Sequence, residues 1–200
     1  MLDIFNRAMR AYATAYRANP LEHFRESDVL CHLVAELRRR ISWKIALTLD
    51  QGVQWDLYKF RDTDLLACPV LTHVGIHGEH PNRTLDLCLL DGETATIMPR
   101  TDGAISSIAP PVALAVEVLI SHGGSGGSRI AALEKDRDNL LKLLDAGKMR
   151  NAAVVFVDHR CKRFLKRNAE QYEALFSGSG VAFHHVSRFG YERDFTPMEN

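Results

Sequence analysis

The sequence has no excess of charge, no long apolar run and no closely paired cysteines. Its 25 basic and 25 acidic residues give a formal net charge of zero, so bulk charge predicts no general attraction to nucleic acid. No apolar run approaches the roughly 20 residues of a membrane-spanning helix. The N-terminal segment also lacks the apolar stretch of a signal peptide. We therefore expect a soluble, cytoplasmic protein that does not contact a membrane.

The four cysteines are too widely spaced for a disulfide framework or a zinc knot. They are Cys31, Cys68, Cys88 and Cys161, and no C-x-x-C pair occurs. This spacing predicts free thiols in a reducing compartment. With 200 residues and 46% hydrophobic content, the chain is long enough for one compact domain. We predict a single domain over residues 1–200, with a helical N-terminal part (1–41) and an α/β core (42–190).

The N-terminal part predicts two amphipathic helices. The first covers residues 2–18, where large apolar side chains recur at helical spacing. The second is expected to start at Asn19, a capping residue followed by Pro20, and to run to about Ile41. Stepping back one turn from its apolar stripe reaches Glu26. This acid is therefore expected on or beside the core-facing side, although a place near the helix N-terminus explains it equally well.

The middle of the chain predicts short strands. The β-prone runs cover 43–49, 53–60, 69–76 and 84–90, and the turns between them favour a largely antiparallel arrangement. A further strand is expected at 94–98, followed by a long loop over 99–111.

The second half alternates strands with helices. We expect strands at 112–120, 151–157 and 181–186, and helices at 129–146 and 163–176, the first of which ends at Gly147. This alternation predicts an α/β protein, with a mixed central sheet flanked by helices on both faces.

Two acids interrupt strands that are otherwise apolar. Asp86 lies within the run 84–90, and Glu117 lies within 112–120, the pattern of a central strand buried on both faces. A carboxylate in such a run is costly unless a metal, a proton or a partner compensates it. Two carboxylates from adjacent strands also supply the hard oxygen ligands that Mg²⁺ and Mn²⁺ prefer. Asp86 and Glu117 are therefore the leading site candidates.

The order of these features resembles the PD-(D/E)XK nuclease superfamily over residues 26–158. A helix with an acid is followed by two strands with acids and then by a helix with lysines. The chain is similar to the branch of restriction-endonuclease-like proteins whose proline-introduced strand carries a Glu-Val-Leu-Ser-like string, matched here by 109–121. The separation of the two acids, 117 − 86 = 31 positions, is also similar, as is the helix–Gly147–strand–Asp158 ending.

This resemblance implies a restriction-endonuclease-like fold and metal-dependent hydrolysis of phosphodiester bonds in DNA. It implies Mg²⁺ or Mn²⁺ as cofactor, with Asp86, Glu117 and the carbonyl of Val118 as ligands. Glu26 would hold a water molecule that does not itself bind the metal, or a second metal, and a lysine would steady the attacking water or the transition state. DNA is the expected partner, and assembly into a homodimer is left open.

The lysine departs from the family pattern. Leu119 stands where the family's lysine lies, and Asn139 stands where the similar branch has moved it. Lys135 and Lys142 lie about one helical turn to either side of Asn139, and we prefer Lys135 because the start of that helix should lie nearer the Glu117 strand. The alternative is a catalytically degenerate module of the same fold that binds nucleic acid or protein. An enzyme acting on a small phosphorylated or nucleotide substrate is a third hypothesis.

Other motifs have simpler explanations. His73, His77 and His80 have a spacing that zinc can use, but surface or substrate-facing histidines are the favoured interpretation. The Gly/Ser run 123–128 precedes a helix, where a phosphate can bind. It lacks the Lys-Ser/Thr of a P-loop, so a flexible connection is favoured.

The remaining charged groups are secondary candidates. The basic clusters 38–40 and 161–167 are interpreted as solvated helix faces, with phosphate contacts as the nuclease alternative. Asp56 and Asp64 lie in polar surroundings, and Asp158 ends an apolar strand, where a turn or cap role is expected.

Overall fold

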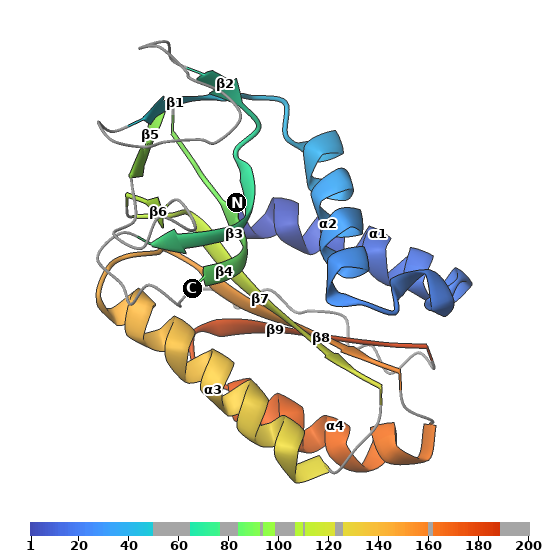
Figure 1. Cartoon of the computed structure of the whole chain (residues 1–200). Helices are drawn as coiled ribbons and strands as arrows, with labels where there is room; N and C mark the ends of the chain where they lie inside the picture. The colour runs from blue at the N-terminus through green and yellow to red at the C-terminus, as the bar shows by residue number, and fades with distance from the viewer. Residues whose placement is uncertain are drawn as a thin grey trace.

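The computed structural model describes residues 1–49, 65–76, 84–92, 94–98, 107–109, 111–122, 126–159 and 162–188. They form a mixed α/β structure in which two helices cover each face of one sheet (Figure 1). The helices are α1 (Leu2–Ala18), the 3-10 helix η1 (Pro20–His23), α2 (Glu26–Arg40), α3 (Gly126–Asp145) and α4 (Lys162–Phe176). The predicted fold class, a mixed sheet flanked by helices with an N-terminal helical part, is confirmed.

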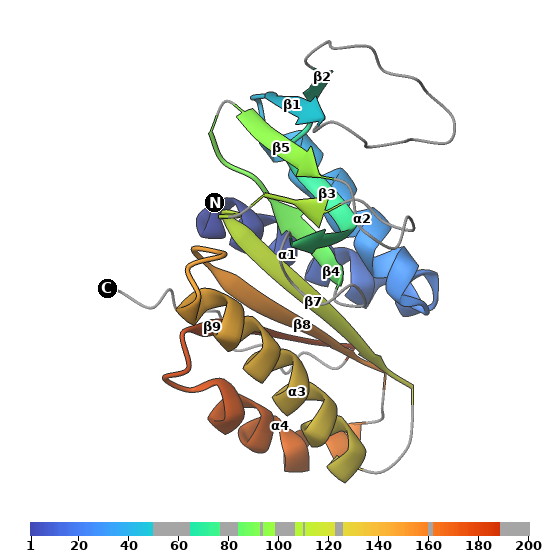
Figure 2. The same cartoon turned by 60° about the vertical axis from the view of Figure 1, so that its left-hand side comes forward.

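The described strands form a nine-stranded sheet in the order β2-β1-β5-β6-β3-β4-β7-β8-β9. Their bounds are β1 Ile45–Leu49, β2 Leu65–Ala67, β3 Val70–Ile76, β4 Thr84–Leu89, β5 Thr94–Met98, β6 Ser107–Ile108, β7 Leu114–Ser121, β8 Ala152–Asp158 and β9 Val181–Ser187. Figure 2 shows β1, β2 and β5 at the end of the sheet far from α4.

The sheet combines two kinds of strand pairing. β3 and β4 are antiparallel, and β4 is antiparallel to β7, whereas β7, β8 and β9 are all parallel. The predicted antiparallel character of the middle of the chain is confirmed for β1–β2 and β3–β4, but β1 also pairs in parallel with β5. The parallel strands β7 and β8 are each followed by a helix, as a β-helix-β crossover requires.

Two apolar cores lie on opposite faces of the sheet. One joins α1 and α2 to alternate residues of the strands, among them Leu87 and Val116. The other joins α3 and α4 to the intervening strand residues, whose side chains point to the opposite face, among them Cys88 and Ala115. Because successive strand residues point to opposite faces, strands buried by helices on both sides are apolar along most of their length. This explains why all seven residues of β8 are buried.

The first helix has the predicted bounds, but the second begins later than predicted. Pro20–His23 form a separate 3-10 turn, and α2 starts only at Glu26. The chain is extended at Arg25, whose backbone N–H donates to the Asp28 carboxylate at 2.8 Å. Asn19 makes no side-chain capping bond. The cap formed by Asp28 therefore sets the start of α2, and Glu26 becomes its first residue.

Two other boundaries differ from the prediction. The expected loop 99–111 contains β6, which pairs with both β3 and β5. The expected Gly/Ser connection is shorter than predicted, because residues 126–128 already form the first turn of α3. The end of α3 agrees with the prediction, since Gly147 adopts the left-handed conformation (φ 66°) that follows many helices. The strand expected at 53–60 lies outside the described residues.

Three cysteines, Cys31, Cys68 and Cys88, are free thiols as predicted, and Cys161 lies outside the described residues. No described helix is both long enough and apolar enough to cross a bilayer.

Candidate metal site at the parting of two strands

Asp86 and Glu117 lie opposite each other where two central strands separate. β4 and β7 pair through Leu89–Leu114, Cys88–Ala115 and Leu87–Val116, and the next positions in this register are Asp86 and Glu117. There the Asp86 carboxylate, rather than the β4 backbone, accepts the N–H of Val118 at 2.7 Å. The two predicted acids are therefore brought together, and the Asp86 side chain takes the place of the next backbone hydrogen bond between β4 and β7.

The backbone of β4 and its neighbour β3 also changes direction at Asp86. Thr72 pairs with Leu87 and Val74 with Leu85, which puts His73 opposite Asp86. His73 has a φ of 51°, a left-handed conformation that few non-glycine residues adopt. Leu85 and Leu87 would share a face in a regular strand, yet they belong to opposite cores. β4 therefore rotates at Asp86, and its acid leaves the regular ladder.

Glu26 brings a third carboxyl to this point. It is the first residue of α2, on the surface of the molecule, and its carboxyl shares a hydrogen bond with that of Asp86. Partial burial, followed by the charge and hydrogen bond of Asp86, raises the pKa of Glu26 to about 7. A helix N-terminus by itself would favour the charged acid. Burial, together with the neighbouring carboxylates, therefore outweighs the effect of the helix dipole on Glu26.

Asp136 is a fourth acid of the cluster, and the sequence analysis missed it. It is half-buried on α3, and burial together with the charge of Asp86 raises its pKa to about 6. The sequence did contain a pattern that points to it, because Asp136 lies between Leu133 and Leu140 on the apolar stripe of its helix. The reasoning that singled out Glu26, an acid in line with a helix's apolar stripe, applies equally to Asp136.

The cluster holds more negative charge than it can accommodate without protons or a cation. Burial raises the pKa of Glu117 to about 10, and Asp86, Asp136 and Glu26 all contribute to the shift. α2 and α3 cover opposite faces of the sheet, yet acids from both helices interact with Asp86. At Asp86, where β4 and β7 separate, acids from the two faces of the sheet therefore interact with the same carboxylate.

The donor set fits a hard divalent cation. Val118 directs its N–H toward Asp86, and a strand residue's N–H and C=O point to the same neighbouring strand, so its carbonyl faces the same side. Among the described residues, no three His, Cys, Asp or Glu side chains are placed to hold a metal by themselves. Mg²⁺ commonly takes one or two carboxylates and completes its shell with water. The carboxylates of Asp86 and Glu117 with the carbonyl of Val118 are therefore enough protein ligands for such a cation.

Lys135 lies beside the cluster rather than within it. Its side chain is exposed, and its positive charge lowers the pKa of the neighbouring Asp136, against the larger effects of burial and Asp86. α3 thus presents Asp136 to Asp86, one position away from the predicted lysine. Leu119 is half-buried against the α3 and α4 core, so the usual lysine position is apolar here.

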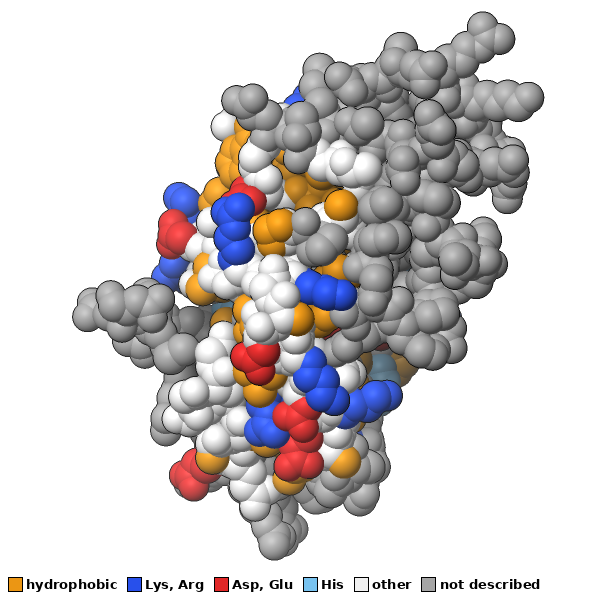
Figure 3. Space-filling model, turned by 90° about the vertical axis from the view of Figure 1, so that its left-hand side faces the viewer, with side chains coloured by type: hydrophobic (Ala, Val, Ile, Leu, Met, Phe, Trp, Pro, Cys, Tyr) orange, Lys and Arg blue, Asp and Glu red, His pale blue; other side chains and the backbone are white. Residues whose placement is uncertain are grey.

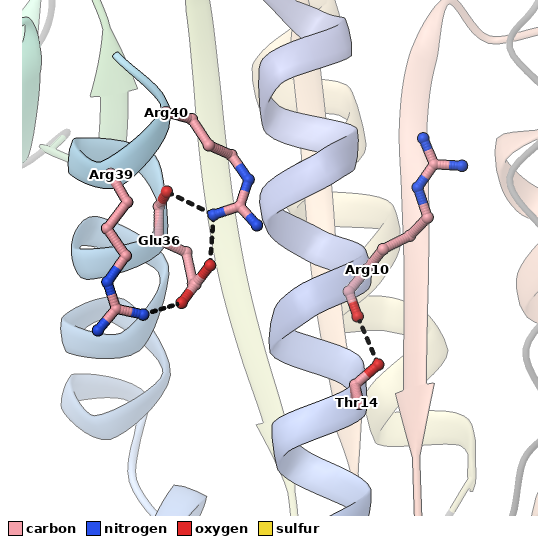
Figure 4. A network of polar contacts seen from close by, with 5 residues as sticks. All are labelled: Arg10, Thr14, Glu36, Arg39 and Arg40. Carbon is pink, nitrogen blue, oxygen red and sulfur yellow. Dashed lines mark hydrogen bonds and ion pairs between the residues drawn. The ribbon is translucent and has the colours of Figure 1, made fainter. Parts of the chain in front are cut away.

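Part of the predicted basic surface is neutralised within α2. Figure 4 shows Arg39 and Arg40 directed at Glu36, which is buried and accepts hydrogen bonds from both. Burial works to raise the pKa of Glu36, but the hydrogen bond and charge of Arg40, with the charge of Arg39, lower it overall. These two arginines therefore hold an internal acid, which the interpretation as a solvated face did not include. The side chains of 162–167 lie outside the described residues.

The remaining charges are mixed in sign. Figure 3 shows acidic and basic side chains interspersed on the described part of one face, as the zero net charge leads one to expect. Asp158 is fully buried, with a carboxylate oxygen 3.8 Å from Nε2 of His185, and the turn or cap role expected for it at the end of the strand stays a prediction. Asp56, Asp64, His77 and His80 lie outside the described residues, so the interpretation of the three histidines as surface or substrate-facing stays a prediction.

Comparisons with protein-family models, with curated proteins and with solved structures find no match for this chain.

Proposed function

We propose that the protein is a metal-dependent nuclease that hydrolyses phosphodiester bonds in DNA. The observation that carries the proposal is the pair Asp86 and Glu117, opposite each other where β4 and β7 part, with Asp86 bound to the Val118 N–H. The order of acids and elements, which resembles the PD-(D/E)XK superfamily, supports DNA as the substrate.

In this proposal Asp86, Glu117 and the Val118 carbonyl hold Mg²⁺ or Mn²⁺. The cation would supply a water of lowered pKa and would offset the charge that develops on the scissile phosphate. The hydrogen bond from Val118 fixes the Asp86 carboxylate, so that its free oxygen keeps one direction. Glu117, on the strand facing it, supplies the second carboxylate.

The other acids hold water rather than substrate. Glu26 shares a hydrogen bond with Asp86, which suits it to orient a water beside the cation. Asp136 reaches the cluster from the opposite face of the sheet and either orients a second water or holds a second cation. In the nuclease proposal, Lys135, whose side chain is exposed next to Asp136, would meet the phosphate from the solvent side.

Cleavage of supercoiled plasmid DNA tests this function directly. The wild-type protein should cleave in Mn²⁺ or Mg²⁺ and not in a chelator, whereas Asp86→Asn and Glu117→Gln should lose at least about a hundredfold in rate. Glu134→Gln is the matched control, because Glu134 is an exposed acid on α3 next to Lys135. Equal cleavage by all variants would reveal a contaminating nuclease, and no cleavage by pure wild-type protein would contradict the proposal.

A second candidate is a noncatalytic module that keeps this fold and binds nucleic acid or protein. The apolar Leu119 at the usual lysine position and the exposed Lys135 favour it. This candidate predicts binding that is indifferent to divalent metal and unchanged in Glu117→Gln. Binding that a chelator abolishes would contradict it.

A further inference from the structure

Three aromatic rings meet at one end of the sheet, close in the chain to the acid cluster. Phe24, at the end of η1, packs on His122 with 4.1 Å between ring centroids and an angle of 33°. His122, just after β7, stacks on His159, just after β8, at 4.9 Å and 18°. Phe24 and His159 are 5.8 Å apart, so the rings form a compact group, the aromatic triad.

The triad is anchored from the inside. The Tyr16 hydroxyl lies 3.0 Å from Nδ1 of His159, and the carbonyl of His23 lies 3.1 Å from Nε2. A carbonyl only accepts, so Nε2 carries the proton and Nδ1 accepts from Tyr16. Both ring nitrogens of His159 are thereby held, and the ring has one orientation. This gives the outer two rings a fixed support.

The outer rings are open to solvent. Phe24 is 52% exposed, and His122 is also exposed. An aromatic side chain that served only to fasten η1 to the sheet would gain most by burying its whole ring. Leu21, on the same turn, is 80% exposed but is not part of the ring group. The turn therefore carries one apolar residue that stacks and one that does not.

The triad is linked in sequence to the proposed metal site. Phe24 precedes Glu26 by two residues, and His122 follows Glu117 by five. Five strand residues span at most roughly 16 Å, which is a few nucleotides along a strand. Exposed Arg25 lies between Phe24 and Glu26 and can meet a backbone phosphate. The triad also lies at the carboxyl ends of two parallel strands, where ligands of α/β proteins commonly bind.

We propose that Phe24 and His122 form a stacking platform for an unpaired base of single-stranded nucleic acid, a few nucleotides from the bond held at the acids. The inference rests on the proposed nuclease function and adds a preference for single-stranded or flap-like regions. Stacking on an aromatic face tolerates any base, because every base presents a π-surface.

Two labelled probes of equal charge test the platform. One is an oligothymidylate dodecamer, and the other is a dodecamer with the same phosphates and abasic sugars. In a chelator, which prevents cleavage, the wild-type protein should bind the thymidylate about tenfold more tightly by fluorescence anisotropy. Phe24→Leu should reduce this preference to nearly onefold, Phe24→Trp should keep it, and Leu21→Ala, the matched control, should leave it unchanged. His122→Ala gives a second route if Phe24→Leu does not fold.

Each result decides the inference. A wild-type protein that binds both probes equally, or neither, overturns it, and so does a preference that persists in both Phe24→Leu and His122→Ala. Displacement of the oligomer by millimolar thymidine monophosphate would identify a free nucleotide as the ligand and overturn the claim for a strand. Plasmid cleavage without a base preference would leave the nuclease standing and remove the platform. A base preference without cleavage would keep the platform and remove the nuclease.

Discussion

Replacing Glu117 by glutamine should make the metal-free protein more stable at neutral pH. The pKa of Glu117 rises from 4.5 to about 10 on folding, mainly through burial and then through the charge of Asp86. Between these values the folded state holds a proton that the unfolded state has lost. The free energy of unfolding therefore falls as pH rises, by about 1.4 kcal/mol per pH unit for one proton. Glutamine keeps the shape and can donate a hydrogen bond as the protonated acid does, but it does not titrate.

From about pH 5 to about pH 8 this slope amounts to a loss of about 4 kcal/mol. That figure is an upper limit, because the charge of Glu26 contributes to the raised pKa of Glu117, so that the proton is not bound by one residue independently of the other. The difference in unfolding free energy between wild type and Glu117→Gln isolates the contribution of Glu117 from those of other titrating groups. Half of the upper limit, about 2 kcal/mol, is still readily measured by chemical denaturation.

The assay is urea unfolding followed by circular dichroism, in a chelator, for wild type, Glu117→Gln and the control Glu134→Gln. The wild type and the control should lose stability relative to Glu117→Gln as pH rises. Adding Mn²⁺ should remove most of this loss, because a divalent cation compensates the carboxylates. Parallel stability curves for wild type and Glu117→Gln would refute the reasoning that these acids are crowded and poorly solvated.

Two further predictions concern the scaffold around the site. His184 is fully buried against Phe5, and burial lowers its pKa to about 3, so the free energy of unfolding should fall as pH falls below about 6.5. His184→Leu should reduce this loss of stability at acid pH in the same denaturation assay. An unchanged loss in the variant would contradict the role given to His184. Leu33 is fully buried where α2 packs on the sheet, so Leu33→Ala should lower the free energy of unfolding by about 2–5 kcal/mol. Leu21→Ala, at an exposed site, should change it by less than about 0.5 kcal/mol. Equal effects of the two substitutions would contradict this packing.

Local patterns determined most of the helices and strands. The first helix has the predicted bounds because its apolar spacing covers the whole element. The start of α2 was wrong because two capping sequences compete there, and Asp28 forms the one that is used. β6 was missed because a strand of two residues carries no periodic signal, and its pairing with β3 and β5 exists only in the folded sheet.

The two acids at the parting of the strands were predicted from sequence for a physical reason. A carboxylate within an apolar strand is expensive wherever that strand lies, so Asp86 and Glu117 stand out without a structure. That they lie opposite each other depends on the register of β4 against β7, which connects positions 31 residues apart. The hydrogen bond from Val118, the rotation of β4 at Asp86 and the approach of Asp136 from the other face arise only from tertiary packing.

What the sequence by itself determined is therefore the set of residues that are costly to bury. The tertiary structure decided which of them meet and which of them an internal partner neutralises, as Glu36 does for Arg39 and Arg40. It also decided which rings stack on one another after β7 and β8. The physical reason is that burial cost is a property of one residue in its local pattern. Contact is a property of two chain segments whose relative position the whole core sets.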